Sequence, residues 1–205
     1  MNKYFISIIF SILVGLSVIS CGGNSYEIEY IPSDGVILAF GDSLTHGSGV
    51  NKSNSYPSQL QILTERKVIN AGIPGELSAD GLKRLPALLD QHNPNLLILT
   101  HGGNDMLRKK DLTLAADNLR SMIREAQNRG ISVIMMAVPN PTLILSPADF
   151  YEAVANDMGV LIDVDTISDV LQFPSNKSDA IHPNEKGYRV MAENLQNLLE
   201  KHGAL

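Results

Sequence analysis

The chain has 205 residues, of which 44% are hydrophobic and 19% are charged, proportions typical of a folded globular domain. Its 16 Lys and Arg residues are outnumbered by 22 Asp and Glu residues, giving a formal net charge of −6, so we expect no nucleic-acid partner. The single cysteine excludes an intramolecular disulfide and a cysteine-based zinc site.

The first twenty residues resemble a secretion signal. Lys3 provides a positive charge, and residues 4–19 are uncharged and almost wholly apolar. This run is shorter than the ~20 residues that a membrane-spanning helix needs, which favours a signal peptide over residues 1–20. A buried N-terminal helix or strand is the alternative, although a run without a polar face does not favour it.

Cys21 follows this segment in the sequence Val-Ile-Ser-Cys-Gly-Gly, which resembles a bacterial lipobox. The resemblance implies cleavage before Cys21 and lipidation of its thiol; the alternative is a plain signal peptide with an incidental cysteine. On the first interpretation residues 21–34 are a tether, residues 35–205 are the folded domain, and the membrane is a partner through the lipid anchor. Gly22 in place of Asp favours the outer membrane of the bacterial cell envelope, facing the periplasm. Nothing in the sequence indicates an oligomeric state.

Five short apolar runs follow, and none alternates strictly between apolar and polar residues. Such runs are typical of strands that are covered on both faces. The predicted strands are residues 36–40, 67–71, 96–100, 132–138 and 160–164.

Helical patterns separate these runs. Apolar residues recur at helical spacing over residues 112–126 and 188–198. Residues 146–147, Ser-Pro, predict the N-cap and first turn of another helix. Pro57 is expected near the start of one helix and Pro86 within a kinked one. The alternation predicts an α/β fold in which a parallel five-stranded sheet has helices on both faces.

Four polar or glycine-rich segments come after predicted strands, at residues 41–47, 70–76, 101–105 and 179–184. In parallel sheets, ligands bind beyond the carboxyl ends of the strands. We therefore expect these four segments to meet in one site.

This set of segments holds one serine with a route to activation. A serine hydroxyl needs a base to take its proton, and the base needs a third group to orient it. Asp179 and His182 are three residues apart, close enough in a turn to interact and to activate Ser43. Donors for an oxyanion are available from Gly75, Asn104 and the backbone N–H of the serine itself. The G-x-S-x-G signature of α/β-hydrolases is absent around Ser43.

These residues resemble the SGNH, or GDSL-type, hydrolase superfamily. Its four blocks occur in order, as Gly-Asp-Ser-Leu at residues 41–44, a glycine at Gly75, Gly-x-Asn-Asp at residues 102–105 and Asp-x-x-His at residues 179–182. The stretch over residues 81–89, Gly-Leu-Lys-Arg-Leu-Pro-Ala-Leu-Leu, resembles the branch that contains bacterial acyl-thioesterases, lysophospholipases and arylesterases.

The resemblance implies a flavodoxin-like, three-layer α/β/α fold and a catalytic triad that uses no cofactor and no metal. It makes Ser43 the nucleophile and the first oxyanion donor, with Gly75 donating from its backbone and Asn104 from its side chain. It makes His182 the base and then the acid, and Asp179 the group that orients the histidine.

Taken alone, each motif has a simpler interpretation. Ser43 and Asn104 could cap helices, and Gly75 could be only a turn residue. His182 could lie in a surface loop. Pro74 departs from the related branch, in which Ser or another small residue precedes the glycine. Because proline stiffens a loop, the departure bears on loop mobility and chain-length preference and not on the reaction type.

Three further polar residues near these blocks are not placed in the catalytic set. His46 and His101 are expected to be neutral and hydrogen-bonded. Arg108 is either a contact for an anionic substrate or a solvated residue at the start of a helix.

The leading functional prediction is a serine esterase that cleaves carboxylic esters or thioesters, with a small-molecule ester as its substrate. One alternative is a carbohydrate acetylesterase of the same fold, and another is a non-catalytic lipoprotein that binds an acyl chain or a sugar. A metal-dependent phosphoesterase is a further alternative, but its ligands lack the paired arrangement of a two-metal site. These ligands would be Asp42, His46, Asn104, Asp105 and His182.

Overall fold

The structure, a computed structural model, describes residues 28–141 and 146–205. Five strands form one sheet in the order β2-β1-β3-β4-β5, and every neighbouring pair is parallel. The strands are β1 (Val36–Gly41), β2 (Lys67–Gly72), β3 (Leu96–Thr100), β4 (Ser132–Met136) and β5 (Leu161–Asp163). All five predicted strands are present. β4 ends at Met136 and not at residue 138, because Met136 is the last residue of β4 that pairs with the short β5.

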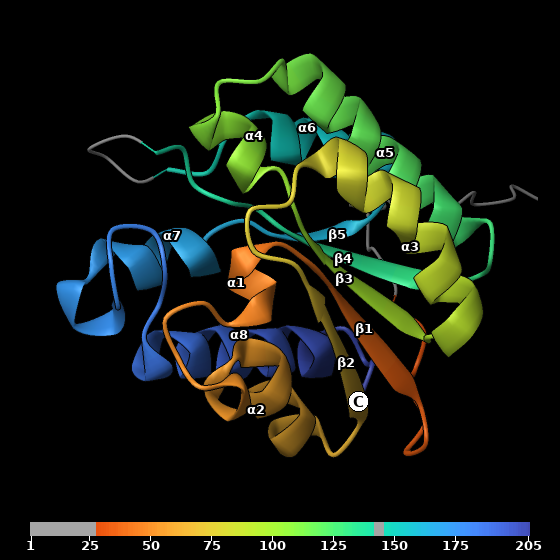
Figure 1. The fold of residues 1–205 in the computed structure, drawn as a ribbon. Coiled ribbons are helices and arrows are strands. Elements are labelled where there is room, and N and C mark those ends of the chain that lie inside the picture. Colours follow the sequence, from red (N-terminus) through yellow and green to blue (C-terminus); the bar gives the residue numbers. More distant parts are fainter. Residues whose placement is uncertain (1–27, 142–145) are drawn as a thin grey trace, which may run out of the picture.

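Helices cover both faces of the sheet (Figure 1), which confirms the predicted three-layer α/β/α fold with a flavodoxin-like strand order. α2 (Tyr56–Thr64) and α8 (Glu185–Lys201) pack against each other on one face. α3 (Ser78–His92), α5 (Leu112–Gln127) and α6 (Phe150–Met158) form the layer on the other. The shorter elements are α1 (Ser43–His46), α4 (Gly103–Leu107), α7 (Thr166–Gln172) and the 3₁₀ turns η1 (Lys52–Asn54) and η2 (Pro174–Asn176).

The core lies between the sheet and its two helical layers. Leu96, Leu97, Ile98 and Leu99 of β3 are all fully buried, which explains why the central strand does not alternate in polarity. Pro57 lies in the first turn of α2 and Pro86 lies inside α3, as predicted. Within the described residues, no helix combines the length and the hydropathy that crossing a membrane requires.

The three strands that precede the first three polar segments end at the same level. Gly41 at the end of β1 is paired with Gly72 on β2 and with Thr100 on β3. Because the strands are parallel and in register, the segments that follow them emerge together at the carboxyl edge of the sheet. The fold therefore brings these segments into one region.

The start of α6 differs from the prediction. The sequence predicts that Ser146 and Pro147 begin this helix, but it begins at Phe150. Pro147 instead forms an isolated antiparallel bridge with Pro139, and the N–H of Asn140 donates to the carbonyl of Ser146 at 2.8 Å. The pairing of residues 139–140 with residues 146–147 thus overrides the local capping signal.

The predicted tether is shorter than residues 21–34, because residues from Ile28 onward pack on the domain. Ile28 and Ile31 are buried, and the N–H of Ile31 donates to the carbonyl of Ala204 at 2.8 Å. The N–H of Glu29 donates to Ser132 Oγ, at the first residue of β4. These contacts are with the far end of the chain and with a strand, so the local sequence does not reveal them. The predicted signal peptide and Cys21 lie outside the described residues.

Candidate active site

Ser43 lies in a tight turn between β1 and α1. It is the first residue of α1, and the carboxylate of Asp42 accepts a hydrogen bond from the N–H of Leu44 at 3.1 Å, which caps the short helix. Gly41, two residues before Ser43, has no room for a side chain, because a Cβ there would lie 2.2 Å from the carbonyl oxygen of Thr100. The end of β1 thus packs directly against β3.

His182 and Asp179 reach the serine from the loop between η2 and α8. His182 Nε2 is 3.0 Å from Ser43 Oγ, and its Nδ1 is 2.7 Å from Asp179 Oδ2. The other carboxylate oxygen accepts the backbone N–H groups of Ile181 and His182 at 2.8 and 2.9 Å. With a proton on Nδ1, the ring donates to Asp179, and its Nε2 is free to accept the proton of the serine hydroxyl.

The charge on Asp179 is favoured by its surroundings. Its partial burial raises the pKa, but the hydrogen bonds from the His182 ring and from two backbone N–H groups outweigh this effect. The net result is a lowered pKa for the Asp179 carboxyl. The group is therefore an anion at neutral pH, the state that stabilises a positively charged imidazole.

Gly75 lies at the tip of the loop that follows β2. The N–H of Glu76 donates to the carbonyl of Ile73 at 3.2 Å, and Gly75 has a φ of +77°. Proline at the second position and a glycine with positive φ at the third are the pattern of a type II β-turn. Pro74 therefore preorganises the turn that presents Gly75, which gives this departure from the family pattern a physical role.

Asn104 comes from the first turn of α4, which follows β3. Its Nδ2 donates to Asp42 Oδ2 and to the carbonyl of Glu76, both at 3.1 Å. The amide thus joins the nucleophile turn to the loop that carries Gly75. Because its two N–H groups have these partners, a substrate oxyanion at Asn104 would share or replace one of them.

Asp42 is the buried acidic residue behind the serine. Burial raises the pKa of its carboxyl, while the nearby His101 and the N–H of Leu44 act in the opposite direction. The side chain contacts Asn104 and Leu44, and no hydrogen bond joins it to His182 among the described residues. Asp42 therefore has a local role in shaping the turn, and Asp179 is the carboxylate that faces the histidine.

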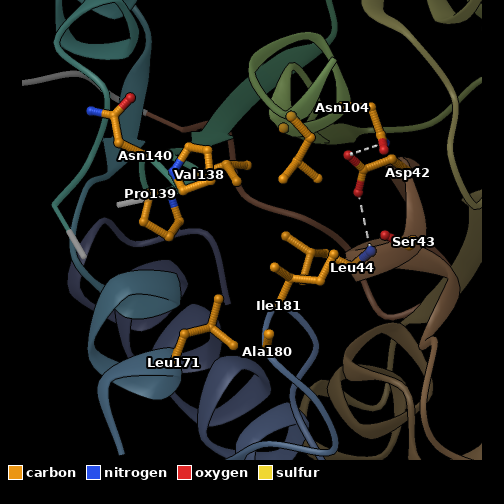
Figure 2. A pocket seen from close by; sticks show the side chains of 13 residues that line it. Asp42, Ser43, Leu44, Asn104, Val138, Pro139, Asn140, Leu171, Ala180 and Ile181 are labelled. Carbon is orange, nitrogen blue, oxygen red and sulfur yellow. Dashed lines mark hydrogen bonds between the residues drawn. The ribbon is translucent and has the colours of Figure 1, made fainter. Parts of the chain in front are cut away.

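An apolar pocket opens beside Ser43 (Figure 2). Figure 2 shows Ser43 and Asn104 on one side of it and Pro139 and Leu171 on the other. The apolar side chains that line it include Leu44, Leu107, Val138, Pro139, Leu171 and Ile181. The pocket is suited to an uncharged acyl or aryl group that lies next to the serine.

The polar residues of the site hydrogen-bond to one another. Over residues 28–141 and 146–205, no group of three or more His, Cys, Asp or Glu side chains is placed to hold a metal ion. Asp105, one of the ligands considered for a metal, instead accepts hydrogen bonds from the N–H and hydroxyl of Ser78 at 2.9 and 2.8 Å. It thereby caps α3 from a neighbouring element.

Comparison with known proteins identifies the family of the chain. Residues 39–190 match the GDSL-like Lipase/Acylhydrolase family. The chain belongs to this family. An arylesterase of Vibrio mimicus is 33% identical over 177 residues, covering 81% of this chain and 88% of the relative. The Escherichia coli K12 thioesterase 1/protease 1/lysophospholipase L1 is 29% identical over 165 residues, covering 77% of this chain and 79% of that protein.

The fold of the chain is also that of the SGNH hydrolases. The crystal structure of the psychrotrophic esterase EstA from Pseudoalteromonas sp. superposes with a TM-score of 0.74 over 82% of this chain and 98% of that one, at 24% identity. The family match and the relatives make the chain a GDSL-type serine ester hydrolase.

Arg108 and Glu76 of this GDSL-type hydrolase make contacts that the sequence did not predict. Arg108 does not start a helix; it follows α4, and its Nη2 donates to the carbonyl of Gly75 at 2.9 Å. Glu76, next to Gly75, received no role from the sequence, because a single acidic residue in a loop is usually solvated. Its side chain is only 7% exposed.

Glu76 belongs to a partly buried hydrogen-bonded cluster. Its carboxylate contacts Arg84 on α3 and His101 after β3, at distances of 2.6 to 3.0 Å. Burial disfavours the charge, but the hydrogen bonds from His101 and Arg84 and the positive charge of Arg84 outweigh it and lower the pKa of Glu76 to about 2. His101 is thus hydrogen-bonded, as predicted, whereas His46 is exposed.

Proposed function

We propose that this enzyme hydrolyses carboxylic esters and thioesters through a covalent intermediate on Ser43. The observation that carries the proposal is the continuous contact from Ser43 Oγ to His182 Nε2 at 3.0 Å and from Nδ1 to Asp179 at 2.7 Å. A hydroxyl, an imidazole and a carboxylate in this order are the arrangement that activates a serine nucleophile.

The cycle has two halves. In the first, Ser43 Oγ bonds to the substrate carbonyl carbon while its proton moves to His182 Nε2. The tetrahedral intermediate then collapses as the alcohol or thiol leaves with that proton, and an acyl-serine remains. In the second half, His182 takes a proton from water, the hydroxide attacks the acyl carbon, and the proton returns to Ser43 as the carboxylic acid leaves. Asp179 orients the ring and stabilises its positive charge throughout.

The negative oxygen of both tetrahedral intermediates needs hydrogen-bond donors. The backbone N–H groups of Ser43 and Gly75 and the side chain of Asn104 are the proposed donors. They are supported by the two hydrogen bonds through which Asn104 joins the Ser43 turn to the Gly75 loop. Donors that are held close to the reacting carbonyl stabilise its negative oxygen strongly, and the Asn104 amide would share or exchange one of its two hydrogen bonds to reach that oxygen.

The substrate class follows from the pocket and from the relatives. The apolar walls beside Ser43, which include Leu107, Leu171 and Ile181, suit an acyl or aryl group without charge. Related proteins are named as an arylesterase and as a thioesterase and lysophospholipase. We expect oxygen esters and thioesters with a hydrophobic acyl group to be cleaved faster than acetylated sugars.

The test is hydrolysis of p-nitrophenyl esters from acetate to palmitate, of an acyl thioester and of an acetylated sugar by residues 21–205. Ser43→Ala should lose turnover on all of them, and Ser53→Ala, which changes an exposed serine in η1, should retain it. Turnover that survives in Ser43→Ala would contradict the proposed nucleophile. Turnover restricted to the acetylated sugar would favour a carbohydrate acetylesterase, and a folded protein that cleaves none of them would favour a binding role.

The proposal extends to the N-terminal segment, which is outside the described residues. Residues 1–20 act as a lipoprotein signal peptide, and Cys21 carries the lipid that anchors the enzyme in the cell envelope, at the outer membrane facing the periplasm. The lipobox-like sequence before Cys21 supports this. Cells fed an alkyne-tagged fatty acid should label the wild type and not Cys21→Ser, with kcat on p-nitrophenyl butyrate unchanged. A Cys21→Ser variant that still takes up the label would contradict lipidation of Cys21.

The attachment point would set how an anchored enzyme faces the membrane. Glu29 contacts the first residue of β4, so the described chain enters at the amino edge of the sheet, whereas Ser43 lies at the carboxyl edge. Residues 21–27 can span at most ~25 Å when fully extended. The active site would therefore be directed away from the anchoring membrane.

A further inference from the structure

The partly buried cluster of Glu76, Arg84 and His101 contacts the chain segments that carry the three proposed oxyanion donors. Arg84 Nε and Nη2 donate to the two carboxylate oxygens of Glu76 at 2.7 and 2.6 Å, a bidentate pair. His101 Nε2 is 3.0 Å from the same carboxylate, and the ring is fully buried. A charged group of this kind is costly to bury, so its retention beside a catalytic site needs a reason.

Arg84 also joins the strands that lead to Ser43 and to Gly75. Its Nη2 donates to the carbonyl of Ala71 near the end of β2 at 2.8 Å and to that of Gly41 at the end of β1 at 3.3 Å. The guanidinium lies 4.0 Å from the centre of the Phe40 ring, which fixes its plane. One planar cation thus links the two strand ends that precede the nucleophile turn and the Gly75 loop.

His101 adds the third strand. It follows β3 immediately, three residues before Asn104, and its ring holds the Glu76 carboxylate. The carbonyl of Glu76 accepts the amide of Asn104 at 3.1 Å. The same residue therefore contacts the cluster through its side chain and an oxyanion donor through its backbone.

The packing of α3 is shaped around this cluster. A Cβ at Gly81 would lie 2.5 Å from His101 Nε2 and 3.0 Å from its Cδ2. The absence of a side chain at this position lets the helix that carries Arg84 approach the buried ring. Only the face of α3 that carries Gly81 and Arg84 contacts the cluster. Lys83 and Asp80 of the same helix form an exposed ion pair on its solvent side.

We propose that Glu76 and Arg84 are positioning residues that fix the spacing of the three oxyanion donors, with His101, directly after β3, as their partner. The cluster joins the ends of β1, β2 and β3, from which Ser43, Gly75 and Asn104 emerge. A displacement of about 1 Å in a catalytic group can reduce turnover about 100-fold, so a fixed spacing matters to the rate. This inference rests on the serine mechanism proposed above.

The test compares Glu76→Gln, Arg84→Met and Arg84→Lys with the control Lys83→Gln. Arg84→Lys keeps the charge but one ammonium cannot contact the carboxylate and both strand carbonyls in the same way, so it should also be impaired. We expect kcat per Ser43 titrated with a fluorophosphonate to fall about 10- to 100-fold, with KM for p-nitrophenyl butyrate changed less than about threefold. Lys83→Gln should match the wild type.

A transition-state analogue separates positioning from a purely structural role. A trifluoromethyl ketone forms a tetrahedral adduct with an oxyanion, so its affinity should fall by the same factor as kcat/KM in each variant. Loss of stability alone would reduce the titrated fraction and leave kcat and this affinity unchanged in the remaining enzyme. That result in a folded Arg84→Lys or Glu76→Gln variant would overturn the inference, whereas turnover that persists in Ser43→Ala would overturn the serine mechanism itself.

Discussion

Asn104 is predicted to contribute both to stability and to catalysis, and Asn104→Ala separates the two effects. The substitution removes two hydrogen bonds of 3.1 Å, one to the buried carboxylate of Asp42 and one to the carbonyl of Glu76. A hydrogen bond to a charged group contributes about 1.5–3 kcal/mol and a neutral one about 1 kcal/mol. We therefore expect the free energy of unfolding to fall by about 2.5–4 kcal/mol.

The catalytic effect should be of similar size but is measured in the folded fraction. Removal of one oxyanion donor typically reduces kcat about 10²–10³-fold, which corresponds to about 3–4 kcal/mol of transition-state stabilisation. Because Asn104 contacts the reacting oxygen only in the intermediates, KM should change far less than kcat. Urea unfolding measures the change in the free energy of unfolding. Hydrolysis of p-nitrophenyl butyrate per phosphonate-titrated site measures the change in kcat.

Asn118→Ala is the matched control. This asparagine on α5 donates to Ser78 Oγ at 3.0 Å, near the same loop but on the far side of the α3 cap. Its removal should cost about 1 kcal/mol of stability and leave kcat unchanged. A kcat for Asn104→Ala within about threefold of the control would refute the oxyanion role. A free energy of unfolding for Asn104→Ala equal to that of the wild type would refute the account of the two Asn104 hydrogen bonds.

Three other substitutions test the contacts of Asp179, Gly81 and Glu76. Asp179→Asn should reduce kcat about 10⁴-fold with little change in stability, since the side chain is 54% exposed, and a kcat near that of the wild type would mean that another group orients His182. Gly81→Ala should destabilise the fold, because overpacking against His101 costs about 1–3 kcal/mol and exceeds the gain in helix propensity of about 1 kcal/mol; unchanged urea unfolding would contradict the contact. The pKa of Glu76, lowered from 4.5 to about 2 by its partners, means that its charge stabilises the fold fully above pH 4.5 and loses this effect as the pH falls through about 2. The difference in unfolding free energy between the wild type and Glu76→Gln should therefore be about 1–3 kcal/mol at neutral pH and should shrink in acid, and an equal difference at both would contradict the assignment.

The strands and the meeting of the polar segments could be predicted from the sequence because both depend on local patterns. A strand such as β3, buried on both faces, leaves an unbroken apolar run, and residues that follow parallel strands must emerge at one edge. The contacts that the sequence did not reveal are made between distant segments. Ile31 pairs with Ala204, and Pro139 pairs with Pro147 in place of the predicted start of α6.

The cluster around Glu76 could not be predicted for a related reason. An acidic residue in a loop and an arginine on a helix are usually solvated, and only the fold places Glu76, Arg84 and His101 together. The proline before Gly75 lies at the second position of a type II turn, a role that depends on the φ of Gly75 and on the hydrogen bond from Glu76 to Ile73. The residues that touch substrate are thus easier to predict from sequence than the residues that hold them.

The central claim is that Ser43 attacks the substrate, and covalent trapping tests it most directly. A fluorophosphonate, whose phosphorus bonds to Ser43 Oγ as fluoride leaves, should add one phosphonyl group to the peptide that contains Ser43 and stop ester hydrolysis in proportion. The mass increase should be absent from Ser43→Ala and strongly slowed in Asn104→Ala. Stoichiometric labelling on another residue, or hydrolysis that continues in the fully labelled enzyme, would contradict the account.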